Sequence, residues 1–227
     1  YEDVFENVSF QMDTKWKLGL IGRNGKGKTT LLHLLMGKYP YKGEISTNAF
    51  FDYFPFQVQK TERLTADVLE DMDPQYEFWK VMREMNDLHM SEELLFRPFQ
   101  TLSYGERTKI ELAVLFAKEN AFLLLDEPTN HLDVKGRKIV ADYLSQKQGF
   151  ILVSHDRAFL DGCVDHILSI NRNSIEVQKG NFSSWYENKK RKDQFELAEN
   201  AKIKKELKHL KEASERTGDW AHRSERS

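Results

Sequence analysis

Apolar residues along the chain gather in short stretches whose spacing predicts strands. Residues 2–12 alternate as in a strand with one buried face, and residues 16–21 form an apolar stretch that ends in a glycine-rich turn. Strand character returns later in the chain, at 43–53, 121–125 and 151–153, and in a closing hairpin formed by 164–170 and 174–178.

Segments of helical character separate these predicted strands. Residues 28–36 are mostly apolar and end at Gly37, a residue that suits the C-terminal end of a helix. Residues 61–98 are acidic and helical in character, and residues 106–118 form an amphipathic helix. Because strands alternate with helices, the pattern predicts an α/β fold.

The composition changes near Gly180. From Lys189 to Arg226 the chain is rich in charge, and apolar residues recur at helical spacing. Residues 181–227 contain twelve Lys and Arg and nine Asp and Glu, a net charge of +3, and the whole chain carries −2, which leaves −5 for residues 1–180. The pattern therefore predicts a globular part followed by a charged helix with a net attraction for anions.

Composition narrows the class of protein. With 40% hydrophobic and 31% charged residues, the chain matches ordinary globular proteins and not disordered or fibrous ones. The single cysteine, Cys163, excludes an internal disulfide framework and fits a reducing compartment. No apolar run approaches membrane-spanning length, and no signal-peptide pattern precedes the first strand. We expect a piece of a longer cytoplasmic protein.

The strongest chemical motif runs from Gly22 to Thr29 and fits the pattern GxxxxGK[ST] between a predicted strand and a predicted helix. Its glycines allow backbone N–H groups to face phosphate oxygens, and the following helix adds the positive end of its dipole. Lys28 would neutralise the β- and γ-phosphates, and the Thr29 hydroxyl would hold Mg²⁺. The alternative is a chance glycine turn, and the strand–helix context argues against it.

Two further motifs follow. The apolar strand 121–125 ends at Asp126 and Glu127, where Asp126 would bind Mg²⁺ and Glu127 would polarise an attacking water. An exposed strand end is the alternative. Ser103 precedes the predicted helix 106–118 and would form an anion site together with the N-terminus of that helix. The alternative is that Ser103 and Glu106 merely cap the helix.

Taken in order, these motifs resemble those of the ABC ATPases over residues 1–180. The phosphate loop is followed by Leu-Ser-x-Gly-Glu at 102–106, by the apolar strand with its two acids, and by Ser-His-Asp at 154–156. The run 128–133, Pro-Thr-Asn-His-Leu-Asp, is similar to that of the ABC-F group, whose members carry two such domains on one chain and act on ribosomes. The run 211–220 is similar to linkers of ABC-F proteins that protect ribosomes from lincosamide, streptogramin A and pleuromutilin antibiotics.

The resemblance implies an α/β fold of the ABC ATPase type. It would comprise a P-loop NTPase core with an antiparallel β subdomain and an α-helical subdomain, the latter at about 60–118. This ATP-binding domain would span 1–181, and a charged linker helix, the start of an interdomain linker, would follow over 182–227.

The resemblance also implies the cofactors ATP and Mg²⁺ and a head-to-tail pairing, with a second ABC domain of the same parent chain or with a second copy of the fragment. Ser103, Gly105 and Glu106 would then contact the nucleotide of the partner, and Asp133 would lie at the seam between the domains. His155 would reach the γ-phosphate and act with Glu127 in catalysis. The chain's own nucleotide would be bound by Gly22, Asn24, Gly25, Gly27, Lys28, Thr29 and Thr30.

The chain departs from the family pattern at two positions. Tyr104 occupies a position where most relatives have glycine, so a side chain there would slow closure or alter contact with the partner's nucleotide. The glutamine that usually contacts ATP and Mg²⁺ is displaced by one residue. Gln57 is the candidate for that role, with Gln59 or loss of the contact as alternatives. Tyr1 is a candidate for stacking on adenine, or an ordinary edge-strand tyrosine.

The partner implied by the ABC-F resemblance is the ribosome, contacted at rRNA and tRNA through the linker, with no membrane partner. Three other functions compete with this one. The chain would alternatively be the nucleotide-binding subunit of a membrane transporter, a nucleotide-gated clamp without useful turnover, or part of a housekeeping translation factor of the same group. The charged tail would alternatively be a solvated helix with no role in binding.

Overall fold

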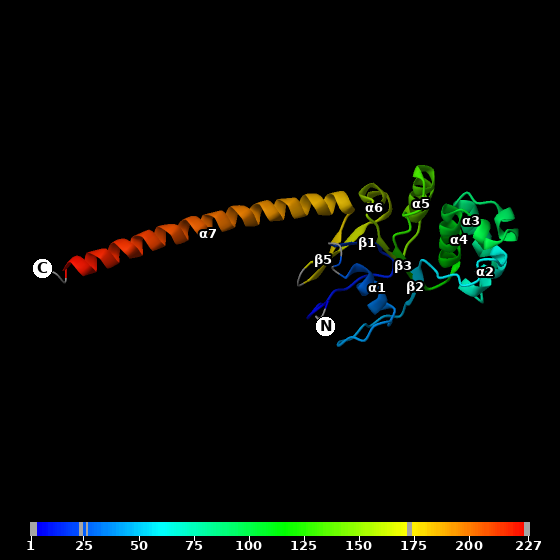
Figure 1. Cartoon of the computed structure of the whole chain (residues 1–227), viewed down its shortest axis with the longest axis horizontal. Coiled ribbons are helices and arrows are strands. Elements are labelled where there is room, and N and C mark those ends of the chain that lie inside the picture. The colour runs from blue at the N-terminus through cyan, green and yellow to red at the C-terminus, as the bar shows by residue number, and fades with distance from the viewer. Residues whose placement is uncertain (1–3, 23–24, 26, 172–173, 225–227) are drawn as a thin grey trace. The chain divides into compact units, whose positions relative to one another are not determined.

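The computed structural model of the chain describes residues 4–22, 25, 27–171 and 174–224. Contacts between residues divide the chain into two units, Tyr1–Ser183 and Ser184–Ser227. The first unit holds a mixed α/β fold, as the sequence predicts (Figure 1). Its described strands form one sheet, and the separate antiparallel β subdomain that the resemblance implies is not seen among them.

The sheet has the strand order β2-β3-β4-β1-β5-β6 among the described residues. All neighbouring strands are parallel except β5 and β6, which pair antiparallel as the predicted closing hairpin. The strands are β1 (Lys17–Gly22), β2 (Phe50–Phe54), β3 (Ala121–Asp126), β4 (Phe150–Val153), β5 (His166–Ile170) and β6 (Ile175–Lys179). Because β1, β3 and β4 are parallel neighbours, their carboxyl ends meet at one edge of the sheet, where ligands bind in open α/β folds.

Helices cover both faces of this sheet (Figure 1). On one face α1 (Lys28–Leu35) buries Leu31, Leu32 and Leu35 in a core cluster that also contains Leu18 and Leu20 of β1. On the other face lie α5 (Val134–Gln146) and α6 (Arg157–Cys163). A Cβ atom on Gly19 would lie only 3.0 Å from Ile167 Cδ1, so the glycine in β1 allows close packing on this second face.

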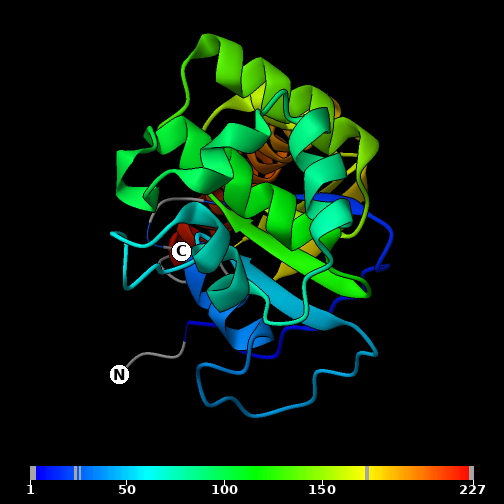
Figure 2. The same cartoon turned by 90° about the vertical axis from the view of Figure 1, so that its right-hand side faces the viewer.

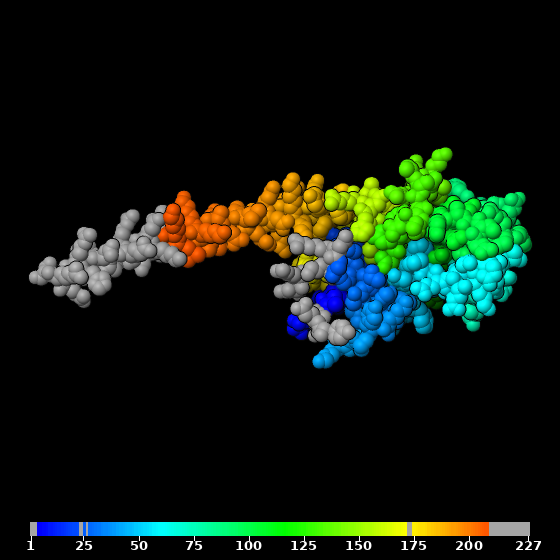
Figure 3. All heavy atoms as spheres, viewed as in Figure 1, coloured from blue at the N-terminus to red at the C-terminus, as the bar shows by residue number. Residues whose placement is uncertain are grey.

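The remaining helices of the first unit form a separate cluster beside β2. They are α2 (Thr65–Met72), α3 (Phe78–Asp87), η1 (Glu92–Phe96), η2 (Phe99–Thr101) and α4 (Tyr104–Ala117). Figure 2 shows this cluster from the front, and in the space-filling view of Figure 3 the atoms coloured cyan to green form one lobe of the unit. The helical character predicted for residues 61–98 is confirmed by α2, α3 and η1.

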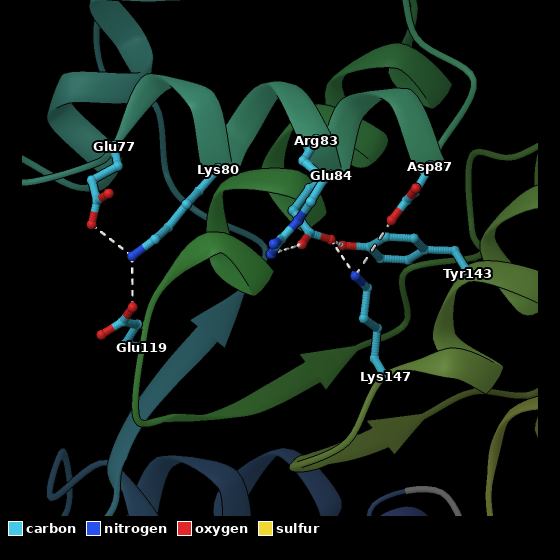
Figure 4. A network of polar contacts seen from close by, with 8 residues as sticks. All are labelled: Glu77, Lys80, Arg83, Glu84, Asp87, Glu119, Tyr143 and Lys147. Atoms are coloured by element: carbon cyan, nitrogen blue, oxygen red, sulfur yellow. Dashed lines mark hydrogen bonds and ion pairs between the residues drawn. The ribbon is translucent and has the colours of Figure 1, made fainter.

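Polar contacts at both ends of α3, buried at Glu84 and exposed where Lys80 meets Glu119, fasten the helical cluster to the rest of the unit (Figure 4). The Glu84 side chain of α3 is only 1% exposed, and its carboxylate accepts a hydrogen bond of 2.7 Å from the Tyr143 hydroxyl of α5. The ammonium of Lys147, which follows α5, donates to the same oxygen. At the other end of α3, Lys80 bonds the carboxylate of Glu119, just before β3, at 2.6 Å. The contacts of Glu84 and Lys80 join α3 to the sheet-bearing part of the unit.

Two predicted strands differ from the structure. The strand predicted over 2–12 is wrong for its described part, because residues 4–12 form no strand. Phe5, Val8, Phe10 and Met12 instead pack against the core cluster, so their alternation reflects one buried face without a paired backbone. The strand predicted over 43–53 begins only at Phe50, where pairing with β3 starts.

The long helix α7 runs from Phe182 to Ser224. Its first turn is bonded within the first unit, because the Ser183 N–H donates to Asp161 Oδ1 at 2.7 Å and the Ser183 hydroxyl donates to the other carboxylate oxygen. Apolar side chains farther along, such as Phe195 and Leu207, are at least half exposed. Within the described part of the chain, no helix combines the length and the apolar character needed to cross a bilayer.

Candidate functional site

The glycine-rich loop connects β1 to α1, as the sequence predicts. Gly25 and Gly27 have φ angles of 73° and 96°, a backbone region that favours glycine. A Cβ atom on Gly27 would also approach Val4 Cγ1 to 2.7 Å. The Lys28 ammonium donates to the Gly22 carbonyl oxygen at 3.1 Å, so it lies over the loop. Of the other predicted nucleotide ligands, Asn24 and Tyr1 lie outside the described residues, and Thr30 is half-buried in the first turn of α1.

Asp126, at the carboxyl end of β3, accepts hydrogen bonds from two hydroxyl groups. Its Oδ2 atom accepts hydrogen bonds from the Thr29 hydroxyl and the Tyr53 hydroxyl, each at 3.0 Å. The pKa of Tyr53 is raised, first by burial and then by the charge of Asp126, so this hydroxyl keeps its proton and remains a donor. Tyr53 was missed from the sequence, because its contact with Asp126 depends on the pairing of β2 with β3, which no local pattern marks.

The chemistry of these oxygens fits Mg²⁺. The hydroxyl of Thr29 and the carboxylate of Asp126 are hard oxygen ligands, which this ion prefers. Among the described residues, no group of three or more His, Cys, Asp and Glu could hold a metal. An ion at this position would therefore take its other ligands from phosphate and water, as Mg²⁺ commonly does in nucleotide sites.

Glu127 and His155 meet across the parallel strands β3 and β4. The Glu127 N–H donates to the Val153 carbonyl oxygen at 2.9 Å, and Glu127 has a φ of 54°, which is uncommon for a residue with a side chain. His155 Nε2 lies 3.3 Å from Glu127 Oε1, and the His155 N–H donates to Oε2 at 3.4 Å. The structure thus brings together the two residues predicted to be catalytic.

The environment of Glu127 suits a base. Its Oε1 atom is buried and accepts no hydrogen bond of good geometry from any described residue. Burial raises the pKa of Glu127, and so does the nearby charge of Asp126, whereas the interaction with His155, the His155 N–H and the Lys28 charge partly oppose that increase. A carboxylate oxygen that is held in place, desolvated and without a donor can accept a proton from water.

The loops beside this pair are held by short polar contacts. The Ser154 hydroxyl hydrogen-bonds the Thr129 hydroxyl at 3.2 Å and accepts the Asp156 N–H at 3.1 Å. Asp133 is exposed and caps α5 by accepting the Gly136 N–H at 2.7 Å. The structure therefore gives Asp133 a local role as a helix cap, and its predicted place at a seam between domains stays a prediction.

The segment around Ser103 forms the start of α4. The Ser103 hydroxyl accepts the Glu106 N–H at 3.3 Å, and the Glu106 carboxylate accepts the Ser103 N–H at 2.8 Å, which together make a capping box. Gly105 faces Leu132, whose Cδ2 would lie 3.4 Å from an added Cβ atom. Tyr104 is 64% exposed, and its ring lies 4.9 Å from that of His131. The capping function is thus present, and contact with a partner's nucleotide stays a prediction.

A cavity of about 350 Å³ lies beside the two acids. Asp126 and Glu127 line it together with Phe54, Phe56 and Glu111. Gln57 does not line this cavity and instead borders a neighbouring hollow of about 310 Å³ with Gln59, Arg63 and Asp71. The structure therefore does not bring the Gln57 side chain to Asp126, and its predicted contact with Mg²⁺ stays a prediction.

Glu111, on α4, was also missed from the sequence. Its side chain is buried, and it accepts a hydrogen bond of 3.1 Å from the Phe56 N–H. Burial raises the pKa of Glu111 to about 7, against the lowering effects of this hydrogen bond and of Arg107. A glutamate at one position of an amphipathic helix carries no signal of burial in the sequence, because surface glutamates look the same.

Comparisons with known proteins agree with this geometry. The profile of the ABC transporter family matches residues 5–130. The chain is 35% identical to the Ribosome protection protein VmlR of Bacillus subtilis, over 77% of this chain and 33% of that protein. It is 38% identical to the Erythromycin resistance ATP-binding protein MsrA of Staphylococcus epidermidis, over 79% of this chain and 34% of that protein. The chain spans about a third of the length of these curated relatives.

A solved structure supports the fold in the same way. The chain superposes with a TM-score of 0.65 on a structure described as an inward-facing conformation of a metal-chelate type ABC transporter. The two are 26% identical, and the match covers 79% of each chain. The similarity therefore extends over most of this chain and supports its fold.

Proposed function

Because this chain belongs to the ABC transporter family of ATP-binding domains, we propose that it binds ATP with Mg²⁺ and hydrolyses the ATP as part of an ABC-F protein. One observation carries the proposal. At the carboxyl edge of the sheet, the Thr29 hydroxyl lies 3.0 Å from Asp126, and His155 lies 3.3 Å from Glu127. This arrangement supports the proposal, because a hydroxyl and a carboxylate suited to Mg²⁺, and a second carboxylate suited to act as a base, would then lie beside a phosphate-binding loop.

Each residue has a separate task in this proposal. The Lys28 ammonium and the backbone of the glycine loop bind the phosphates, and Thr29 and Asp126 hold Mg²⁺. When bound, Mg²⁺ neutralises charge on the phosphate oxygens. Glu127 accepts a proton from the attacking water, and His155 positions that carboxylate and the terminal phosphate. Gly22, Gly25, Gly27 and Thr30 complete the loop, and Gln57 would join only after its loop moves.

Two substitutions test this division of tasks. Lys28→Ala should weaken binding of a fluorescent ATP analogue, because the lysine neutralises phosphate charge in the ground state. Glu127→Gln should leave binding intact and stop hydrolysis, because its carboxylate acts only when water attacks. Equal losses of affinity in the two variants would show that Glu127 is a binding residue and would refute the proposed chemistry.

We further propose that the protein acts on the ribosome in the cytoplasm and protects it from an antibiotic. The names of two relatives, a ribosome protection protein and an erythromycin resistance protein, support this. In this proposal residues 182–227 begin a linker to a second ABC domain, which pairs head-to-tail with this one, and a second copy of the chain could replace it. Ser103, Gly105 and Glu106 then complete the partner's site, with Asp133 at the seam.

The linker's charge gives the ribosome proposal a test. The four side chains of Lys202, Lys204, Lys205 and Lys208 are exposed on α7. Changing all four to glutamine in the full-length Glu127→Gln protein with ATP should weaken co-sedimentation with ribosomes about tenfold at 0.1 M salt, because phosphate contacts are lost. A matched control changes four exposed lysines of the first unit, at positions 15, 42, 60 and 138.

The outcomes separate the candidate functions. Unchanged co-sedimentation of the α7 variant would remove the electrostatic role of the helix and leave it a solvated spacer. No co-sedimentation of the parent protein would instead favour the nucleotide-binding subunit of a membrane transporter, the kind of protein that the superposed structure represents. Loss of antibiotic tolerance in cells that express Glu127→Gln would support protection over a housekeeping role in translation.

A further inference from the structure

Glu111 links two segments that lie far apart in the sequence. It lies on α4, two turns after the capping box at Ser103, and its side chain is only 8% exposed. Its Oε2 atom accepts the N–H of Phe56, which belongs to the loop that follows β2. This hydrogen bond joins the inner face of α4 to that loop.

A second contact fixes α4 to the same strand. The Lys118 ammonium, at the end of α4, bonds Asp52 Oδ2 at 2.5 Å and the Met72 carbonyl oxygen at 3.0 Å. Helix α4 and the residue that ends it therefore hold β2 at its middle through Asp52 and just past its end through Phe56. Tyr53 lies between these two points, and its hydroxyl donates to Asp126. The residue that Glu111 holds, Phe56, is thus only three positions along the chain from Tyr53, which contacts the proposed metal ligand Asp126 directly.

The burial of Glu111 is costly. Its neighbours in the cavity include Phe54, Phe56 and Phe99, and a buried carboxyl without full hydrogen bonding is unfavourable. Arg107, one turn earlier on α4, does not form an ion pair with it among the described residues. Its guanidinium donates to the Gln100 carbonyl oxygen at 2.7 Å and packs 5.3 Å from the Phe99 ring.

An apolar residue of similar size would fill the same space at a lower cost. The carboxyl is therefore poorly explained by packing, and its one clear partner is the Phe56 N–H. The glutamate also shares its cavity with Asp126 and Glu127, the acids of the proposed reaction. Its hydrogen bond thus holds one wall of the space in which the proposed hydrolysis takes place.

We propose that Glu111 is a positioning residue for ATP hydrolysis, which holds the loop after β2 by accepting the Phe56 N–H and so keeps Tyr53 aligned on Asp126. The proposal rests on the proposed hydrolysis at Asp126 and Glu127. Since Ser103 caps α4, the same bond would couple the loop after β2 to the segment offered to the partner.

The test compares three variants of the full-length protein. Glu111→Leu fills the space without an acceptor, Glu111→Gln keeps an acceptor oxygen, and Glu62→Leu makes the matched change at an exposed residue of the same loop. We expect Glu111→Leu to lower kcat about tenfold, the size of one lost hydrogen bond, with the Kd for ATP unchanged within about twofold. Glu111→Gln and Glu62→Leu should stay within about twofold of the original kcat.

Either of two results would overturn the proposal. Glu111→Leu hydrolysing at the original rate would show that the bond does not matter, and Glu111→Gln losing as much as Glu111→Leu would show that an acceptor is not what matters. If Glu111→Leu does not fold, amide exchange of the unaltered protein decides. The Phe56 amide should exchange at least about tenfold more slowly than in an unstructured chain, and fast exchange there would refute the bond.

This measurement also separates the two proposals. If the unaltered protein and Glu127→Gln hydrolyse ATP equally, the proposed chemistry fails. The exchange rate of the Phe56 amide then still reports whether Glu111 holds the loop, because it requires no turnover.

Discussion

Replacing Glu84 with glutamine should strongly destabilise the first unit. The carboxylate is 1% exposed and bonds the Tyr143 hydroxyl, the Lys147 ammonium and the Arg83 guanidinium, so the change leaves two cations facing an uncharged amide (Figure 4). Removing one partner of a buried ion pair costs about 3–5 kcal/mol. We expect the lower end, because the Lys147 side chain is 19% exposed and lies 3.7 Å from Asp87 Oδ2, a second carboxylate that stabilises it.

A loss of about 3 kcal/mol predicts a fall in Tm of about 6–12 °C for a unit of this size. Thermal unfolding followed by circular dichroism measures it, and urea unfolding gives the free energy independently. Repeating the scan at 0.5 M salt distinguishes a buried pair from a surface pair, since salt screens the latter far more.

Glu77→Gln is the matched control on the same helix. The Glu77 carboxylate also bonds a lysine, Lys80, at 2.6 Å, but its side chain is 51% exposed. We expect no measurable change in Tm, because exposed ion pairs contribute little. If Glu84→Gln lowers Tm no more than Glu77→Gln does, the reasoning that burial makes the Glu84 network stabilising is wrong.

Four further predictions concern other parts of the chain. Gly149→Ala should cost about 2–3 kcal/mol in urea unfolding, because Gly149 has a φ of 75° and a Cβ atom would lie 2.7 Å from the Thr14 carbonyl oxygen. Gly162→Ala in α6, with open space around it, should instead stabilise by up to about 1 kcal/mol. The folded-state pKa of Glu111, about 7 against 4.5 for an ordinary glutamate, contributes stability that is complete below about pH 4.5 and is lost as the pH rises through 7. Glu111→Gln should therefore gain on the order of 2 kcal/mol relative to the original chain between pH 5 and pH 8, and a pH-independent difference would contradict this. The chain alone should hydrolyse ATP much more slowly per site than the full-length protein, and equal rates would refute head-to-tail completion of the site.

The part of the site that lies in contiguous residues could be predicted from the sequence. The glycine loop and the two acids after β3 are local patterns, and parallel pairing of neighbouring strands brings them to one edge. The pairing of Glu127 with His155 follows from the same rule, since Glu127 comes directly after β3 and His155 comes two residues after β4.

The contacts of Tyr53 and Glu111 could not be predicted in this way. Tyr53 meets Asp126 across 73 positions of sequence, and Glu111 meets Phe56 across 55. Nothing local marks either side chain, because both contacts depend on how β2 and α4 pack. The alternation in residues 2–12 led to a wrong strand prediction for a related reason. Burial of one face requires only a core to pack on, whereas a strand also requires a neighbouring strand to accept its hydrogen bonds.

The contact between Asp161 and Ser183 has a consequence for how the long helix begins. Starting an α-helix in water is the unfavourable step, because several residues must be ordered before the first hydrogen bond forms. The carboxylate of Asp161 satisfies an N–H of the first turn and places a negative charge at the positive end of the helix dipole. The ATP-binding unit thus supplies α7 with a nucleus for its first turn. A different helical sequence joined after Ser183 would inherit that nucleus, whereas the same helix cut free of the unit would have to form one by itself.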